Sequence, residues 1–487
     1  MHRNSVLTVL LHTLCGTVSV SNTVMLNNMQ AAVKDFLNQS FTQHYTLSSP
    51  TLVTWLWSLT NAIYFVGFIV GTTQMRWLAE SRGRRFCTIF INDIGTILGT
   101  LLISAAKWLN RFELLFVARF VMGVSRPFGI LVRVYLYECC VGKQAALATS
   151  FIQFGCIGWI TFTASIAMPQ LLGSNSSWNL VILPHFLFAS LHLVLGLVFL
   201  PESPRHLFIT VKDSSKTVEA IKFYQGNTAD VDSILQTLTD EAQLVGSQET
   251  PNLCSVLKTS HLSWPFWLTI VIGIVSNGAG LLFADAYSST VLVGLGFSKE
   301  TASLLSLFAM TVPALVACPF GVLASRYVPR RVHLLAGLTV MCLGCLLVMA
   351  AEFSKFDRIV AQWLGPIGMG CITISCWASV EIVMHLVPSE VCPQNIRSMA
   401  VSWRIILSYL VSTLELTLIL PLYHYIGAVA FCPLFLVGFV GLIFLYKYLP
   451  ETFGEKLDVT VSRWRSKESS QLLAECLSLS YGSITSR

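Results

Sequence analysis

"SLTNAIYFVGFIVGTTQMRWLAESRGRR", Ser58 to Arg85, decides the fold, because a long apolar run passes directly into a short arginine-rich turn. A helix needs about 20 mostly apolar residues to cross the hydrocarbon core of a bilayer, and this run is long enough. The whole chain of 487 residues is 54% hydrophobic and 11% charged, whereas ordinary soluble domains are about 25% charged. The composition therefore predicts a membrane protein and argues against a nucleic-acid partner.

Similar apolar runs recur along the chain from Ser5 to Leu449, about twelve in all. They are continuously apolar and lack a period of two, which favours spanning helices over the strands of a barrel. The predicted spans are 5–26, 52–74, 86–107, 112–136, 145–168, 179–200, 264–286, 300–324, 332–352, 357–387, 397–422 and 426–449. The predicted fold class is thus an all-α membrane protein with about 12 transmembrane helices.

Short basic turns set the expected orientation of these spans. Arg76–Arg85 and Ser325–Arg331 are arginine-rich, and the positive-inside rule places such turns in the cytoplasm. Counting spans from them puts both termini in the cytoplasm and the sequons at Asn38 and Asn175 in outer loops. We therefore expect a multi-pass protein of the plasma membrane that is glycosylated at both asparagines.

The two halves of the chain repeat each other. Arg84-Arg85, Glu138 and Pro201-Glu202 each have a counterpart about 250 residues later, in the same order. Two six-helix bundles around a central cavity follow from such a duplication, and this is the arrangement of carriers that work by alternating access. The predicted domains are an N-terminal bundle at 1–200, a cytoplasmic linker with short helices at 201–263, a C-terminal bundle at 264–450 and a disordered cytoplasmic tail at 451–487.

Several motifs together resemble one known family. The stretch Ser58–Arg85, "RFVMG" at Arg119–Gly123, "LPESPRHL" at Leu200–Leu207 and "LPETFG" at Leu449–Gly454 are similar to those of the facilitative glucose (GLUT-type) transporters of the major facilitator superfamily. The resemblance covers nearly the whole chain. It implies the major facilitator fold and facilitative transport of a hexose, polyol or related small solute, with the lipid bilayer as surroundings and without a cofactor.

The resemblance also implies a cytoplasmic gate. In such transporters, acidic residues after the fourth and tenth helices pair with loop arginines across the two bundles and hold the outward-open state. The positions that match here are Gly83, Arg84, Arg85, Arg119, Glu138, Glu202, Arg205, Arg330, Arg331, Glu390, Arg397 and Glu451. The alternative is that these arginines only set the topology.

A substrate site is implied by the same resemblance. Gln153 stands where the family has a sugar-binding glutamine, and Ser276 and Asn277 stand opposite a pair of glutamines. His385 replaces a tryptophan of the tenth helix. Asn27 and Trp377 complete the predicted substrate-binding residues. Because each lost hydrogen-bond partner of a sugar costs roughly 1 kcal/mol, these replacements leave the substrate open.

Ionisable residues within the predicted spans offer another interpretation, since such residues usually face a cavity or a partner. They are Asp93, Arg126, Arg133, Asp285, Glu381, Arg404, Glu415, His185, His192 and His385. Arg126 or Arg133 would bind a small organic anion, and Asp285 or Glu381 would exchange a proton and couple transport to a gradient. Pairing between helices with a purely structural role is the alternative.

The sequence also bears on two other functional classes. The altered seventh and tenth helices and the long tail also fit a non-transporting nutrient sensor on the same fold. An enzyme is not expected, because the sequence has no HExxH motif and no nucleophile with a matching histidine base. The 14 cysteines lack metal-ligand spacing, so no metal site is expected.

Overall fold

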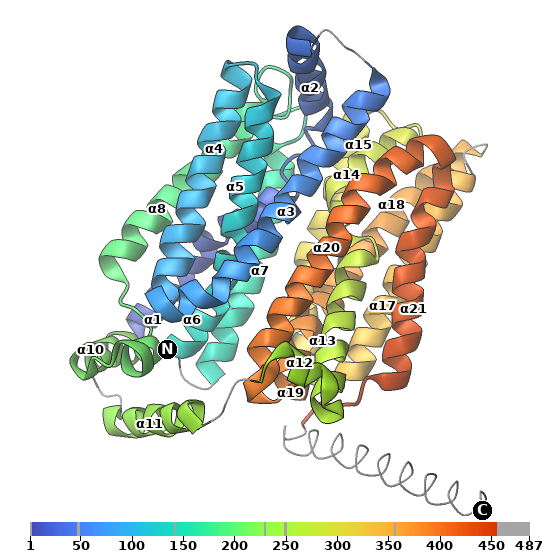
Figure 1. Ribbon diagram of the computed structural model, residues 1–487. Coiled ribbons are helices and arrows are strands. Elements are labelled where there is room, and N and C mark those ends of the chain that lie inside the picture. The colour runs from blue at the N-terminus through green and yellow to red at the C-terminus, as the bar shows by residue number, and fades with distance from the viewer. Residues whose placement is uncertain are drawn as a thin grey trace, which may run out of the picture.

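The computed structural model describes residues 2–45, 49–140, 143–227, 230–247, 251–354 and 357–454, and all regular elements in these ranges are helices. Two halves stand next to each other, with α3 and α20 facing one another between them (Figure 1). Residues 455–487, which include most of the tail predicted to be disordered, lie outside the described ranges.

The first half begins the chain. Its elements are α1 Arg3–Leu14, η1 Gly16–Thr23, α2 Gln30–Tyr45, α3 Pro50–Arg82, η2 Phe86–Ile91, α4 Asn92–Trp108, α5 Phe112–Ile130, α6 Val132–Cys139, α7 Lys143–Ile166, η3 Trp178–Ile182 and α8 Leu183–Phe199. The segment after it holds α9 Pro204–His206, η4 Leu207–Val211, α10 Ser214–Gln225, α11 Val231–Ser247 and α12 Leu253–Lys258. We call the end of the molecule that carries α10, α11 and α12 the linker end, and the opposite end the α2 end (Figure 1).

The second half follows the linker. Its elements are α13 Ser260–Gly278, α14 Leu281–Gly294, α15 Lys299–Ser306, η5 Leu307–Thr311, α16 Val312–Ala324, α17 Arg330–Phe353, α18 Arg358–Ser375, η6 Cys376–Val380, α19 Glu381–Val391, α20 Gln394–Ile426, η7 Gly427–Phe431 and α21 Cys432–Tyr448. Helix α13 packs against both α20 and α21.

Eleven helical stretches in the described ranges are long and apolar enough to cross a membrane. The last of them, Asn395–Tyr448, has 54 residues, and at about 1.5 Å per residue it would span well over twice a hydrocarbon core of about 30 Å. The chain reverses inside this stretch at η7, where Gly427 has a φ of 60°. It therefore crosses twice, and the prediction of about twelve transmembrane helices in two bundles is confirmed.

Several spanning helices change their winding near the middle. The first passes from α1 into the 3₁₀ segment η1, and α13 passes into α14 through Gly280, whose φ of 96° suits glycine. Leu131 separates α5 from α6, and the π-helical turn η6 joins α18 to α19. Such interruptions free backbone polar groups, which a membrane protein can hold only inside the protein or beside a cavity.

Small residues allow α3 and α5 to pack closely. A Cβ atom on Gly123 would lie 2.0 Å from the carbonyl oxygen of Tyr64, and one on Gly67 would lie 2.3 Å from that of Phe120. Transmembrane helices associate through such small residues because lipid gives no hydrophobic drive between them. This contact fixes α5, which carries Arg126, one charged residue of the site described below.

We predict that Gly123→Ala lowers the thermal unfolding midpoint of the detergent-purified protein, because the new methyl group would clash with backbone. Overpacking of this kind costs about 1–3 kcal/mol. Gly158→Ala is the matched control, since a Cβ there meets no atom within 4 Å. Equal midpoints for the two variants would contradict this account of the packing.

Candidate functional site

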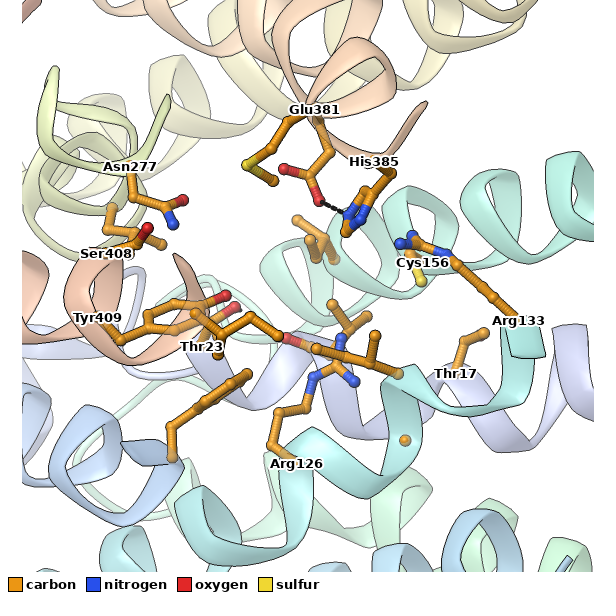
Figure 2. Close-up of a pocket in the computed structure, with 18 of the residues that line it drawn as sticks. Thr17, Thr23, Arg126, Arg133, Cys156, Asn277, Glu381, His385, Ser408 and Tyr409 are labelled. Carbon is orange, nitrogen blue, oxygen red and sulfur yellow. Dashed lines mark hydrogen bonds and ion pairs between the residues drawn. The ribbon is translucent and has the colours of Figure 1, made fainter. Parts of the chain in front are cut away.

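A cavity lies between the two halves. Its walls come from η1, α3, α5, α6 and α7 of the first half and from α13, α14, η6, α19 and α20 of the second half (Figure 2). The residues that line the cavity include members of η1 and η6 and the sequence neighbours of Leu131 and Gly280, where the helices are interrupted. The cavity volume is about 100 Å³, which is enough for several water molecules or one small polar solute.

Charged side chains from both halves line this cavity. They are Arg126, Arg133, Asp285, Glu381, His385 and Arg404. Figure 2 shows Glu381 and His385 on one side and Arg126 and Arg133 on the other. Nε2 of His385 lies 3.1 Å from Oε1 of Glu381. The sequence interpretation singled out these charges, and the structure brings them to one place.

Two of the guanidinium groups in the cavity have unused donors. Among the described residues, Arg126 has no hydrogen bond or ion pair, and Nε of the buried Arg404 has no hydrogen-bond partner. Arg133 donates to Oε1 of Gln153. Because guanidinium groups bind carboxylates and phosphates with several donors at once, the cavity can accept an acidic group as well as hydroxyl groups.

Aromatic rings form one wall and join the halves. Tyr409 of α20 stacks on Phe65 of α3 with ring centroids 5.5 Å apart, and its ring lies 4.1 Å from that of Phe68. Tyr409 and Phe68 both line the cavity. Sequence reasoning did not select Tyr409, although an aromatic residue five positions after Arg404 on the same helix was a usable signal.

Only half of the predicted substrate-binding residues line the cavity. Asn277, Trp377 and His385 do so. Gln153 lies behind Arg133 and Ser276 donates to the carbonyl of Ile272 in its own helix at 2.6 Å, so neither lines it. The resemblance gave their positions along the helices, but the side chains of this sequence have found partners within the protein.

Asn27 is also outside the cavity, and it joins the two halves toward the α2 end. Its Nδ2 donates to Oγ of Ser288 at 2.7 Å, and its Oδ1 and backbone carbonyl accept from Oγ of Ser289 at 2.6 and 2.7 Å. Thr290 donates to Gln30 beside it. We call Asn27, Gln30, Ser288, Ser289 and Thr290 the seal.

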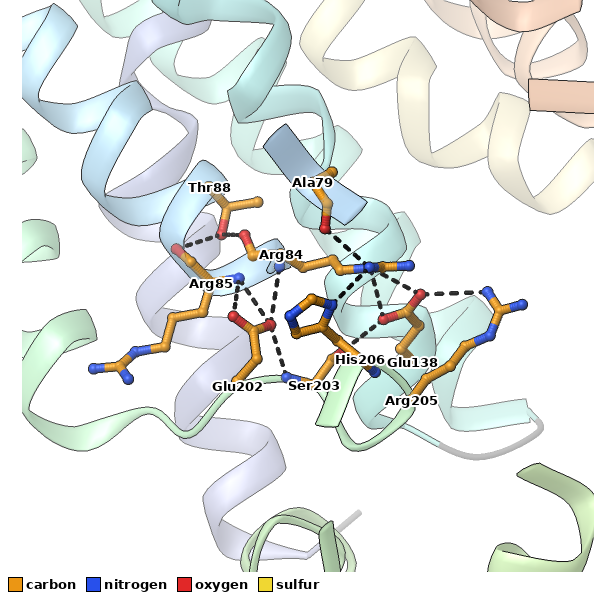
Figure 3. Close-up of polar contacts among 9 residues, drawn as sticks. All are labelled: Ala79, Arg84, Arg85, Thr88, Glu138, Glu202, Ser203, Arg205 and His206. Atoms are coloured by element: carbon orange, nitrogen blue, oxygen red, sulfur yellow. Dashed lines mark hydrogen bonds and ion pairs between the residues drawn. The ribbon is translucent and has the colours of Figure 1, made fainter. Parts of the chain in front are cut away.

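The gate residues of the first half form one cluster at the linker end (Figure 3). Nε of Arg84 lies 3.2 Å from both carboxylate oxygens of Glu138, and Arg205 lies 3.4 Å from Oε1 of the same group. The carboxylate of Glu202 accepts the backbone N–H groups of Arg84, Arg85 and Ser203 at 2.9–3.1 Å. Gly83, with a φ of 97°, lies against Glu202.

The second half repeats this cluster almost contact for contact. Nε of Arg330 donates to Oε1 of Glu390 at 3.1 Å, and the backbone N–H groups of Arg330 and Arg331 donate to Glu451 at 2.8 and 3.2 Å. Thr452 donates to Oε2 of Glu390 at 2.6 Å, as Ser203 does to Glu138 at the same distance. The duplication seen in the sequence is thus a duplication of contacts.

The ion pairs of these two clusters stay within one half each, as far as the described ranges extend. The expected pairing across the bundles is therefore not met in this conformation. Arg397 donates to the carbonyl of Cys392 in its own half at 3.3 Å. The short segments after α8 and α21 supply Glu202 and Glu451, so each half closes its own cluster.

Arg119 corrects the sequence prediction. It was expected at the gate, but it lies about two turns from the start of α5, far from Glu138 at the end of α6. Its guanidinium is fully buried, donates to the carbonyls of Asn22 and Thr60 and lies 4.6 Å from the ring centroid of Tyr64. The arginine therefore holds the interrupted first helix against α3.

The two glycosylation sequons both lie toward the α2 end. Asn175 is exposed in the loop before η3, and its Nδ2 donates to Asp35 of α2 at 3.1 Å. Asn38 lies on α2. The exposure of Asn175 leaves room for a glycan, and modification of both asparagines stays a prediction.

Other internal charges predicted from the sequence lie away from the cavity. Asp93 and His192 contact each other in the first half, and His185 contacts Ser21. Glu415 is buried in α20, with neither carboxylate oxygen hydrogen-bonded in the described part of the chain. Within those same ranges, no group of three or more His, Cys, Asp or Glu side chains could hold a metal ion.

The geometry of two repeated halves around a shared cavity can be compared with known proteins. The family model for sugar (and other) transporters matches residues 8–463. This chain belongs to the sugar transporter family. It is therefore a multi-pass membrane transporter and not an enzyme, and the resemblance to GLUT-type transporters is confirmed.

Named relatives of this sugar transporter family member are distant. Facilitated glucose transporter member 1 of Gallus gallus is 25% identical over 460 residues, covering 92% of this chain and 91% of the relative. Member 9 of Homo sapiens is 25% identical over 448 residues, covering 88% and 79%. The inward open xylose transporter XylE of E. coli superposes over 94% of this chain and 100% of its own, with a TM-score of 0.74 and 16% identity, and therefore shares the fold.

We predict that acidification destabilises this sugar transporter family member partly through His206. Burial, together with the nearby Arg84 cation, lowers the pKa of His206 from 6.5 to about 4. Between these values the unfolded chain binds a proton that the folded chain does not, so stability falls as pH decreases. The contribution is at most about 1.4 kcal/mol per pH unit.

Thermal unfolding midpoints of the detergent-purified protein from pH 7 to pH 5 would test this. His206→Gln should show a smaller decrease than the wild type. His44→Gln, at the partly exposed His44 of α2, should keep the wild-type decrease. A wild-type slope in His206→Gln would contradict the assignment.

Proposed function

We propose that this protein is a facilitative carrier of a hexose, a polyol or a related small solute, working by alternating access. The cavity carries this proposal, because it is lined by both repeated halves at the points where their helices are interrupted. A solute bound there contacts both halves at once. Tilting the halves would then expose it first to one side of the membrane and then to the other.

The present arrangement of contacts supports a state closed toward the α2 end. The seal joins the halves there through hydrogen bonds of Asn27 with Ser288 and Ser289. At the linker end, the Arg84–Glu138 and Arg330–Glu390 pairs each stay within one half. The opposite state requires the seal to open, and the gate residues of the two halves would then meet.

Orientation follows from the same residues. The arginines of the first-half cluster (Figure 3) and of its second-half counterpart lie at the linker end, and the positive-inside rule assigns that end to the cytoplasm. Both termini would then be cytoplasmic, and Asn175 would face outward, as in a glycoprotein of the plasma membrane. The relatives named as glucose transporters support a sugar as the first solute to test.

A small organic anion is the second candidate, and a specific observation favours it. Three guanidinium groups line the cavity against the carboxylates of Asp285 and Glu381. Arg126 has no hydrogen bond or ion pair within the described ranges, so its donors are available to a ligand. A charged group left without its partner in a site of low polarity is costly, so an acidic solute would bind here better than in a neutral cavity.

We predict that two variants separate these solutes in counterflow by the purified protein in liposomes. Asn277→Ala, which removes a cavity amide, should reduce flux of labelled hexoses and polyols about fivefold or more. Arg126→Ala should reduce flux of labelled small carboxylates about tenfold or more. Ser276→Ala is the control, because Ser276 lies outside the cavity.

Counterflow of the labelled hexoses, polyols and small carboxylates is measured with and without a pH gradient, to detect the coupling of flux to protons. Hexose counterflow that is sensitive to Asn277→Ala would support the first proposal, and carboxylate counterflow that is lost in Arg126→Ala would support the second. Binding without counterflow by folded protein would overturn the carrier proposal and favour a nutrient sensor. Flux unaffected by either variant would mean that this cavity is not the route.

A further inference from the structure

Three ionisable side chains form a continuous chain in the core of the first half. Nδ1 of His192 on α8 lies 2.7 Å from Oδ2 of Asp93 on α4, and its Nε2 lies 2.9 Å from Nδ1 of His12 on α1. None of the three has any exposed surface. We call Asp93, His192 and His12 the buried triad. It is separate from the cavity residues and from the gate.

The hydrogen bonds of the triad admit two protonation states. With one proton on His192, its Nδ1 donates to Asp93, and the bond to His12 needs a proton from His12. With one more proton in the triad, both nitrogens of the His192 ring donate, Nδ1 to Asp93 and Nε2 to Nδ1 of His12, whose own proton is then on Nε2, and the triad as a whole is neutral. The first state leaves a net negative charge in a fully buried place, and the second is neutral. An isolated buried charge is costly, so the triad is built to take up one proton.

The surroundings leave the triad as the local titrating unit. Among the described residues, Asp93 forms an ion pair with His192 and with no lysine or arginine, and its Oδ1 accepts from Asn92. The ring of Tyr135 on α6 lies 5.4 Å from that of His12, and its hydroxyl is bonded to that of Tyr224 on α10. Cys15, between α1 and η1, is close enough to interact with the charge of Asp93.

The triad touches the moving part of the first span. A Cβ atom on Gly16 would lie 2.8 Å from Cε1 and Nε2 of His192 and 3.3 Å from Nδ1 of His12. Gly16 also lines the cavity and begins η1, which leads toward Asn27 of the seal. A single residue without a side chain therefore separates the triad from the cavity.

We propose that Asp93, His192 and His12 form a proton-binding site that holds the first span against α8. Proton uptake makes the His192–His12 hydrogen bond charge-assisted, with Nδ1 of His12 as its acceptor, and removes the buried net charge, so it tightens α1 and η1 onto α8. The segment from Gly16 to Asn27 is then held in the position that makes the seal. Loss of the proton loosens this segment. Protons would thus bias the carrier toward the sealed state without binding in the cavity.

Hydrogen–deuterium exchange of peptides covering residues 16–27 tests this without any substrate. The detergent-purified full chain is compared at about pH 6 and about pH 8, after correction for the intrinsic pH dependence of exchange. Wild type should exchange more slowly at the lower pH. The corrected rate should change by up to about tenfold per pH unit, which is the limit for one linked proton.

Variants locate the effect. His192→Gln and Asp93→Asn should each abolish the corrected pH dependence. His185→Gln should keep it, because His185 is an equally buried histidine on α8 that contacts Ser21 of the same segment at 2.8 Å. Monodisperse elution and a cooperative thermal transition show that each variant is folded, and if one Asp93 or His192 variant fails this check, the other decides.

Three results would overturn the proposal. They are pH-independent corrected exchange in the wild type, persistence of the pH dependence in a folded His192 or Asp93 variant, and its equal loss in His185→Gln. Because exchange is measured without solute, these results do not depend on which compound the cavity carries.

Discussion

Every backbone polar group inside a bilayer must find a partner in the protein, and the rest of this structure depends on that constraint. Continuous helices satisfy it by themselves. A helix can be interrupted only where side chains, other helices or a cavity take over. Here the interruptions at η1, Leu131, Gly280 and η6 all lie around one cavity. At these four places the unusual backbone and the polar site are thus two aspects of a single arrangement, whereas the π-helical turns η2 and η5 do not line the cavity.

Duplication extends to the level of single hydrogen bonds. Glu202 and Glu451 each accept backbone N–H groups of an arginine pair, while Glu138 and Glu390 each bind the side chain of the first arginine. A carboxylate that accepts several N–H groups is held firmly. Each half therefore closes its linker end with its own residues, and neither half needs the other to keep that end folded. The halves can move as units for this reason.

The sequence predicted the spans and the repeat because both are written as one-dimensional patterns. Long apolar runs give the number of crossings, and paired motifs such as Arg84-Arg85 and Arg330-Arg331 give the duplication. The sequence indicates less clearly how deep a residue lies in the membrane and which face of its helix it occupies. Arg119 was expected at the gate, although about five turns of helix, at about 3.6 residues per turn, separate it from Glu138.

Half of the predicted substrate-binding residues lie outside the cavity for a related reason. Gln153 is in a helix near the cavity, but Arg133 lies in front of it and takes its carbonyl oxygen. Arg133, about two turns before the end of α6, thus takes the place at the cavity that was predicted for Gln153. No pattern in the sequence of α7 predicts this exchange. The internal charges were a better guide, because burying Arg126, Glu381 and Arg404 in lipid would be expensive, which left a cavity as their place.

The stacking of Tyr409 against Phe65 and Phe68 has a consequence for how fast the halves can exchange positions. Contacts between ring faces are short-ranged but weakly directional, so they can slide without an all-or-none rupture. The activation enthalpy of the exchange should then come from the hydrogen bonds of Asn27 and not from this wall. In such a carrier, the aromatic contacts of Tyr409 would slide over a low energy barrier, and the hydrogen bonds of Asn27 would supply most of the barrier. The two sets of contacts lie at different depths of the same interface.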